Sequence, residues 1–261
     1  GPLFAASSPD RARLVAADTD FAFTLLKQLG SEQRAQNVFV SPYSISTVLQ
    51  MVANGAGGDT REEIARVLGT AGLETRAVQQ AHKELDKAIA DARGEVELRV
   101  ANALWNSVAV ELKPAFVSLN REFYGATLDA LDFTDPRTGG IVNAWADQHT
   151  GGRIKNIIAG RLPGDTSLLL ANAIYFKGAW ERKFDPKFTQ DRPFHLAGGG
   201  QRQAPMMRQS GEFPYQEGNG CQAVRLPYKG GRLGMYALLP EPGSSVTKLL
   251  ATMNASVWQE T

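Results

Sequence analysis

The 261-residue sequence contains one cysteine, Cys221, and only three histidines. A lone cysteine cannot close an internal disulfide, and three scattered histidines offer no metal-binding cluster, so we expect no metal ion and no cofactor. A thiol enzyme would need one of these histidines as a base, yet no catalytic signature surrounds Cys221. The residue is better explained as a small buried hydrophobe in a strand, and the chain is predicted not to be an enzyme.

Net charge is also nearly absent, because 28 basic side chains stand against 27 acidic ones. No overall field attracts nucleic acid or an anionic membrane, so neither is an expected partner. The longest uncharged stretch, residues 35–58, contains Pro42 and ends in glycines, which excludes a bilayer span. The glycine-rich segments GAGGDT (55–60) and GNGC (218–221) lack the lysine of a phosphate-binding loop and are predicted to be turns. The first ten residues, GPLFAASSPD, lack the pattern of a signal peptide.

One stretch, residues 73–93, is rich in basic side chains. A site for a polyanion such as a glycosaminoglycan is one interpretation. Acidic residues are interleaved with the basic ones, so a solvated helix face of mixed charge is favoured. The basic positions are Arg76, His82, Lys83, Lys87 and Arg93.

The chain is long enough for a large core, and its apolar periodicity predicts interleaved helices and strands. Helices are predicted over residues 10–29, from Pro42 onward, and over 60–69, 73–93, 114–124 and 138–150. Strands are predicted over residues 96–100, 126–133, 167–176, 203–216, 221–227 and 232–239. Gly30 is expected to end the first helix, and Thr60–Glu63 to form a capping box. The apolar run SLLLANAIYF at 167–176 indicates a strand covered on both faces at the centre of a sheet.

Residues 37–58, NVFVSPYSISTVLQMVANGAGG, form an uncharged segment with an unusual serine-rich start. Ser41 is a helix cap, and Pro42 suits the first turn because it has no amide hydrogen to lose. The helix is expected to have one apolar face, Ile45, Val48, Leu49 and Val52, and one uncharged polar face that need not meet water, Ser44, Thr47, Gln50 and Asn54. Two interpretations remain open: a cap followed by ordinary helix serines, or a hydrogen-bonded joint under a sheet that moves.

Five segments, in the same order along the chain, resemble the serpin family. They are NVFVSPYSISTVLQMVANGAGGDTREEI (37–64), ANALWNS (101–107), IVNAWADQHTGGRIKNII (141–158), LANAIYFKGAWERKFDPKFT (170–189), and PMMRQSGEFPY with CQAVRLPYKGGRLGMYALLPE (205–241). The resemblance implies an α+β fold with a large mixed β-sheet, further sheets and about eight or nine helices. Residues 1–261 are then the N-terminal portion of a single serpin domain, and the arginine- and alanine-rich composition suggests a bacterial member.

The resemblance also implies roles for particular side chains. It places Ser41, Ser44 and Asn172 in a polar "shutter" under the sheet. It places Trp180 in a "breach", where the sheet first opens. It assigns Asn143, Trp145 and Thr150 to a helix that covers the face of the sheet. Taken alone, Asn172 would be a locally satisfied core amide and Trp180 a packing aromatic.

The function implied by the resemblance is inhibition of a serine protease, or of a cysteine protease. In serpins, a reactive loop is cleaved and inserts into the sheet as a new strand, while the protease stays attached as an acyl-enzyme. The alternative is a non-inhibitory serpin that acts as a carrier or chaperone. The sequence stops in MNASVWQET, before the family's reactive loop and last strands, so the reactive bond is unknown and a further C-terminal segment is an expected partner. The expected location is extracellular or periplasmic.

Overall fold

A computed structural model of the chain describes residues 8–32, 36–92, 94–196 and 199–261. The chain forms an α+β fold that divides into two compact units. The first unit takes the described residues up to Phe21, together with Ser41–Ala90 and Glu97–Lys177. The second takes the described parts of Ala22–Val40, Asp91–Val96 and Gly178–Thr261.

The first unit contains a sheet of three strands, β1 (Glu97–Ser107), β2 (Thr127–Leu131) and β3 (Leu168–Lys177). Their order is β2-β1-β3, with β1 parallel to β2 and antiparallel to β3. Within the described residues β3 is therefore an edge strand, and its position at the centre of a sheet stays a prediction for the longer protein. The periodicity of a strand's sequence indicates how its two faces are covered. Which strands pair with its edges depends on segments far away in the chain.

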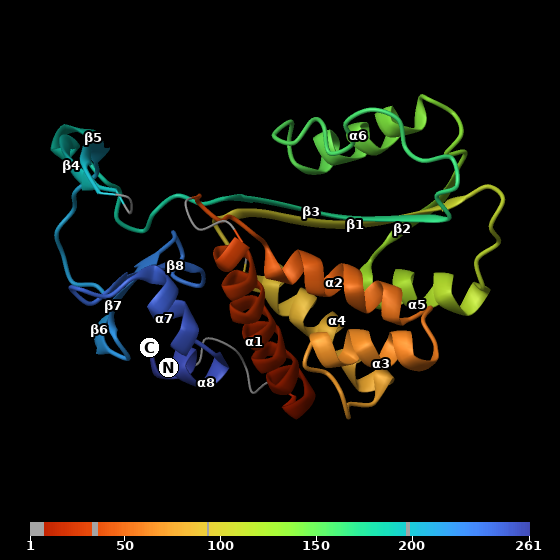
Figure 1. Ribbon diagram of the computed structural model, residues 1–261, viewed down its shortest axis with the longest axis horizontal. Coiled ribbons are helices and arrows are strands. Elements are labelled where there is room, and N and C mark those ends of the chain that lie inside the picture. The colour runs from red at the N-terminus through yellow and green to blue at the C-terminus, as the bar shows by residue number, and fades with distance from the viewer. Residues whose placement is uncertain (1–7, 33–35, 93, 197–198) are drawn as a thin grey trace. The chain divides into compact units, whose positions relative to one another are not determined.

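Alternate side chains of β1 and β3 pack into two separate clusters, one on each face of the sheet. Trp105 packs with Val142 of helix α6 (Thr138–His149) on one face. Leu104 packs on the other face with Met51 of α2 (Pro42–Ala53) and Phe123 of α5 (Pro114–Tyr124). Figure 1 shows α6 on one side of these strands and α2 and α5 on the other. The sheet is covered on both faces, which the apolar run of β3 predicted.

Helix α2 begins as predicted, but its apolar face is less buried than expected. Ser41 is the N-cap, accepting a hydrogen bond from Ser44 N, and Pro42 occupies the first turn. Ile45, assigned to the apolar face, is 37% exposed. Thr47 and Gln50 are buried, in agreement with a polar face that need not meet water. Thr47 Oγ1 and Gln50 Oε1 each have a hydrogen-bonding partner on another helix, which offsets the cost of burying them, whereas Gln50 Nε2 has no partner among the described residues.

Other helices depart from expectation at their ends. Helix α1 (Pro9–Glu32) continues through Gly30. Helix α3 (Gly58–Val67) starts before Thr60, with Gly57 as N-cap and no side-chain cap bond, so the predicted capping box is not formed. Gly58, at the start of the helix, has a left-handed φ of +52°, a conformation that favours glycine. Helix α4 spans Thr75–Ala92, close to its predicted range.

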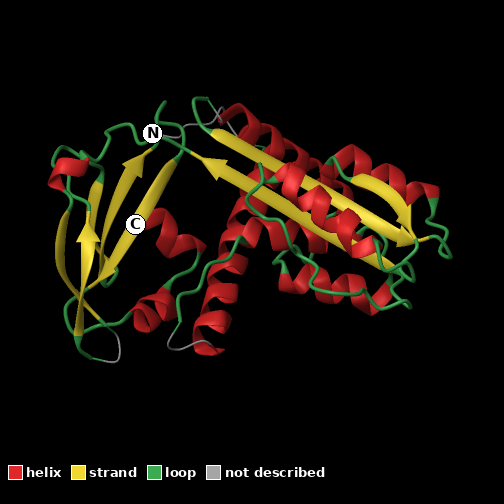
Figure 2. Ribbon diagram, turned by 90° about the horizontal axis from the view of Figure 1, so that it is seen from above, coloured by secondary structure: helices red, strands yellow, loops and turns green. Residues whose placement is uncertain are grey.

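The second unit contains two antiparallel sheets, β4-β5 and β6-β7-β8. Seen from above, Figure 2 shows their strands in yellow beside short helices. The strand predicted over 203–216 is divided into the end of β5 and the start of β6, and GNGC is the turn between β6 and β7, as predicted. The elements are η1 (Pro186–Phe188), β4 (Gln190–His195), β5 (Gln201–Met206), β6 (Tyr215–Gly218), β7 (Cys221–Pro227), β8 (Gly234–Pro240), α7 (Val246–Thr252) and α8 (Ala255–Glu260).

Cys221 lies at the start of β7 and is 2% exposed. It packs against Leu249 and Met253 in the core of the second unit. Burial raises the pKa of its thiol, which disfavours the nucleophilic thiolate. The prediction of a small buried hydrophobe is confirmed.

Candidate functional site

Two of the three predicted shutter residues are in direct contact. Ser41 has extended backbone angles, and its Oγ accepts hydrogen bonds from Ser44 N at 3.3 Å and from Ser44 Oγ at 2.8 Å. One hydroxyl thus caps the helix and binds a second hydroxyl one turn later. Both serines are half-buried.

The third predicted residue, Asn172, lies in β3 directly opposite Asn102 of β1. Asn172 Nδ2 donates to Asn102 Oδ1 at 2.7 Å, and Asn102 Nδ2 donates to the Tyr124 carbonyl oxygen at 2.7 Å. Both asparagines alternate in step with Leu104 and Leu170, which pack on the α2 face of the sheet. Asn172 therefore belongs to the same face as α2, although no hydrogen bond between described residues joins it to Ser41 or Ser44.

The asparagine pair continues into a network that the sequence did not reveal. Tyr124 Oη donates to Gln50 Oε1 at 3.4 Å, and the Tyr124 ring centre lies 4.5 Å from that of His82. His82 Nε2 in turn lies 3.1 Å from Thr47 Oγ1. Side chains from β1, β3, α2, α4 and α5 are thereby connected beneath the sheet.

Burial keeps this network uncharged. It lowers the pKa of His82, outweighing the carboxylate of Asp86, whose Oδ2 lies 3.6 Å from His82 Nδ1. It also raises the phenol pKa of Tyr43, which donates a hydrogen bond to Asp86, and that of Tyr124. On α1, burial of the carboxylate raises the pKa of Asp18 to about 6.

The prediction that His82 lies on a solvated face is wrong, because its side chain is fully buried. The spacing of Val78, His82, Leu85 and Ile89 follows a helical stripe, and this signal could have placed the imidazole on the buried face. Arg76 agrees with the prediction, since its side chain is 66% exposed and forms an ion pair with Glu122. Arg93 lies outside the described residues.

Helix α6 holds the segment that follows it against the sheet. Asn143 Nδ2 donates to Ile158 O at 3.0 Å, and its Oδ1 accepts from Ile157 N and Ile158 N at 2.8 Å each. Thr150 Oγ1 donates to Ala146 O at 2.7 Å and accepts from Ile154 N at 2.9 Å.

Trp145 makes the contact between α6 and the sheet. Its ring meets Trp105 of β1 edge-on, with centroids 5.4 Å apart. After α6, Gly151 and Gly152 take left-handed angles and end the helix as predicted. The three side chains assigned to a sheet-covering helix thus fix α6 and its following loop over the strands.

Trp180 follows β3 by three residues and belongs to the second unit. It forms an isolated antiparallel bridge with Tyr228, and the two rings stack with centroids 4.6 Å apart. Phe184 meets the Trp180 ring edge-on at 6.0 Å. The tryptophan is therefore the centre of a small aromatic cluster.

Among residues 8–32, 36–92, 94–196 and 199–261, no group of three or more His, Cys, Asp or Glu side chains is arranged to hold a metal ion. Over the same residues, no helix combines the length and hydrophobicity needed to cross a bilayer.

Known proteins resemble this chain over nearly its whole length. The family model for Serpin (serine protease inhibitor) matches residues 16–261. Bovine leukocyte elastase inhibitor is 36% identical over 236 residues, covering 88% of this chain and 61% of the relative. Mouse antithrombin-III is 32% identical over 253 residues, covering 94% of this chain and 54% of the relative.

A solved structure agrees with the sequence matches. Emu ovalbumin superposes with a TM-score of 0.88 at 28% identity, covering 95% of this chain and 68% of the ovalbumin chain. The chain thus spans 61% and 54% of the lengths of the two curated relatives. The chain belongs to the serpin family of serine protease inhibitors.

Proposed function

We propose that the protein carrying this chain inhibits a serine protease as a suicide substrate. A reactive loop in the full-length protein is cleaved by the protease serine, which remains bound to the loop as an acyl ester. The loop then inserts beside β3 and carries the protease with it, distorting the active site before water can hydrolyse the ester. We place this activity outside the cytoplasm, in the extracellular space or the periplasm.

The buried Asn172 Oδ1 of β3 is the observation that carries the proposal. Within the described residues β3 has a neighbour on one side only, and its other side is where a further strand of the longer protein would pair. At this edge Asn172 Oδ1 is buried and accepts no hydrogen bond from the described residues. An unpaired buried acceptor costs about 1–3 kcal/mol. A strand added beside β3 would pair the backbone and bring a donor within reach of this oxygen.

The polar groups beneath the sheet support a moving rather than a rigid joint. Ser41 and Ser44 are small, and a hydroxyl can rotate to exchange one partner for another. Asn102 and Asn172 link β1 and β3 through side chains. We assign Ser41, Ser44 and Asn172 to the shutter that lets neighbouring strands separate, α6 to the covering element that must yield, and Trp180 to the breach.

A carrier or chaperone that keeps the fold without inserting its loop is the rival function. Incubation of the full-length protein with trypsin-like, chymotrypsin-like and subtilisin-like proteases separates the two. We expect an adduct that survives SDS with at least one protease. Cleavage by all three classes without an adduct would contradict inhibition and favour the rival.

The contribution of Asn172 can be tested in the same assay. We expect Asn172→Ala to reduce the adduct about two- to fivefold relative to cleaved inhibitor, since a loss of about 0.5–1 kcal/mol in the insertion step shifts partitioning by that factor. Asn37→Ala, at an exposed position, is the control and should behave as wild type. If both variants gave the same ratio of adduct to cleaved inhibitor, Asn172 would have no role in the insertion step.

A further inference from the structure

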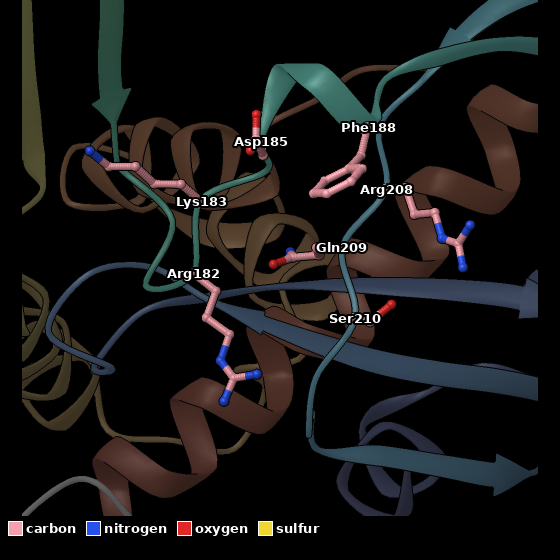
Figure 3. A pocket seen from close by; sticks show the side chains of 7 residues that line it. All are labelled: Arg182, Lys183, Asp185, Phe188, Arg208, Gln209 and Ser210. Carbon is pink, nitrogen blue, oxygen red and sulfur yellow. The ribbon is translucent and has the colours of Figure 1, made fainter.

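A cleft in the second unit lies outside the polar network and has no role in the function proposed above. Its volume is about 730 Å³, and it lies between residues 182–188, which include η1, and residues 208–210, which follow β5. Such a volume is in the range of ligand sites. Figure 3 shows the Phe188 ring and the Gln209 carboxamide pointing into the space between the two segments.

Three residues that line this cleft are cationic, Arg182, Lys183 and Arg208, and in Figure 3 the Lys183 and Arg208 side chains extend outward from it. Within the described part of the chain, none of them forms an ion pair with a carboxylate. The one carboxylate lining the cleft, Asp185, accepts a hydrogen bond from Lys187 N at 3.0 Å and caps η1. The lining therefore carries a net formal charge of +2, which favours an anionic ligand.

Arg182 has a defined position beside the cleft. Its guanidinium carbon lies 5.9 Å from the centre of the Phe213 ring. A Cβ added at Gly211 would lie 1.8 Å from Arg182 Nη1, so the missing side chain at this position makes room for the guanidinium. Ring contact and backbone packing together reduce the side-chain freedom that an arginine loses on binding an anion.

Two further features of the cleft indicate what else its ligand should contain. Phe188 is 60% exposed and offers an apolar surface within the cationic rim. Gln209 Oε1 is buried and accepts no hydrogen bond from the described residues, so it lacks an N–H donor. A peptide combines a backbone N–H, a carboxylate side chain and an apolar side chain, whereas a simple inorganic anion supplies only the charge.

We propose that this cleft binds an acidic peptide segment of a partner protein, with Glu or Asp beside an apolar residue. The carboxylates pair with Arg182 and Arg208, the apolar side chain packs on Phe188, and a peptide N–H donates to Gln209 Oε1. This site stands independently of loop insertion, because none of its residues belongs to the sheet of the first unit.

The test measures fluorescence anisotropy of a labelled, end-blocked peptide of sequence GELEG with the full-length protein. We expect saturable binding that weakens at high salt, and none with the uncharged analogue GQLQG. Arg182→Gln and Arg208→Gln should each weaken binding about three- to tenfold. Lys248→Gln removes one charge from an exposed site on α7 and should leave affinity unchanged.

Gly211→Ala tests whether the position of the Arg182 guanidinium matters apart from its charge. It keeps every cation but displaces this guanidinium, so it should weaken binding of the peptide as Arg182→Gln does. Circular dichroism of each variant checks that the fold is retained. Absence of saturable binding, an equal loss with Lys248→Gln, or binding of a sulfated polysaccharide without the peptide would each overturn the proposal.

Discussion

At the scale of single residues, two buried ionisable groups in the first unit respond to pH in opposite ways. Asp18 has its pKa raised by burial from 3.8 to about 6, so the folded protein holds this proton more tightly than the unfolded chain does. Its contribution to stability is greatest below pH 3.8 and falls as the pH rises to about 6. His82 has its pKa lowered by burial, so protonation below its ordinary pKa of 6.5 favours the unfolded chain.

We predict that Asp18→Asn stabilises the folded protein at pH 7.5, because it removes a buried charge without removing the side-chain volume. A shift from 3.8 to about 6 corresponds to about 2–3 kcal/mol. The advantage should shrink toward zero near pH 4, where Asp18 is protonated in wild type. Urea unfolding of both proteins from pH 4 to 7.5 measures the difference in their unfolding free energies. The contribution of His82 is the same in both proteins and cancels in this difference. A constant difference across this range would contradict a raised pKa at Asp18.

A second residue-scale prediction concerns Thr47, which is fully buried and whose hydroxyl lies 3.1 Å from His82 Nε2. Thr47→Val keeps the shape of the side chain but leaves the buried imidazole nitrogen without its partner. We expect a loss of about 1–3 kcal/mol in unfolding free energy. Thr19→Val is the matched control, because the Thr19 hydroxyl donates to Val15 O within an exposed part of α1. Equal losses in both variants would show that the Thr47–His82 contact contributes nothing of its own.

At the scale of elements, local signals predicted α5 and the start of α2 correctly. Pro114 begins α5 and Gly125, with φ of +57°, ends it at the predicted residues. The Ser41–Ser44 contact also follows from local sequence, because the two residues are three apart on one helix. The partners of the buried polar face of α2 were less accessible to prediction, since Thr47 contacts His82 on α4.

The same distinction applies to the candidate site. Asn172 was singled out because it interrupts an apolar strand. Asn102 interrupts the apolar run VANALW in the same way, whereas Tyr124 carries no such signal. Their bonds depend on the register of β1 against β3 and on where α5 packs. Edge or centre position in a sheet is likewise a property of strands far apart in the chain.

Helix α6 gives a prediction at this scale. Asn143→Ala removes three hydrogen bonds that attach the following segment to the helix, so the amides of Ile157 and Ile158 should exchange with solvent about ten- to a hundredfold faster. Hydrogen exchange followed by mass spectrometry resolves this segment. Gln148→Ala, at an exposed position of α6, should leave exchange unchanged. Unaltered protection in Asn143→Ala would show that the segment is held by other contacts.

At the scale of the whole molecule, the polar network and the edge of β3 belong to one unit, while Trp180 and the cationic cleft belong to the other. We assign strand acceptance to the first unit and peptide recognition to the second. Family membership rests on the match over residues 16–261, and the inhibitory activity is our proposal for the longer protein. Inhibition by this route requires the sheet to accept a further strand beside β3.

The most direct measurement is a crystal structure of the full-length protein before and after cleavage of its reactive loop. We predict a new strand hydrogen bonded along Leu168–Lys177 after cleavage, with a donor close to Asn172 Oδ1. A cleaved protein in which β3 keeps the neighbours it had before cleavage, with its loop left in solvent, would contradict strand insertion.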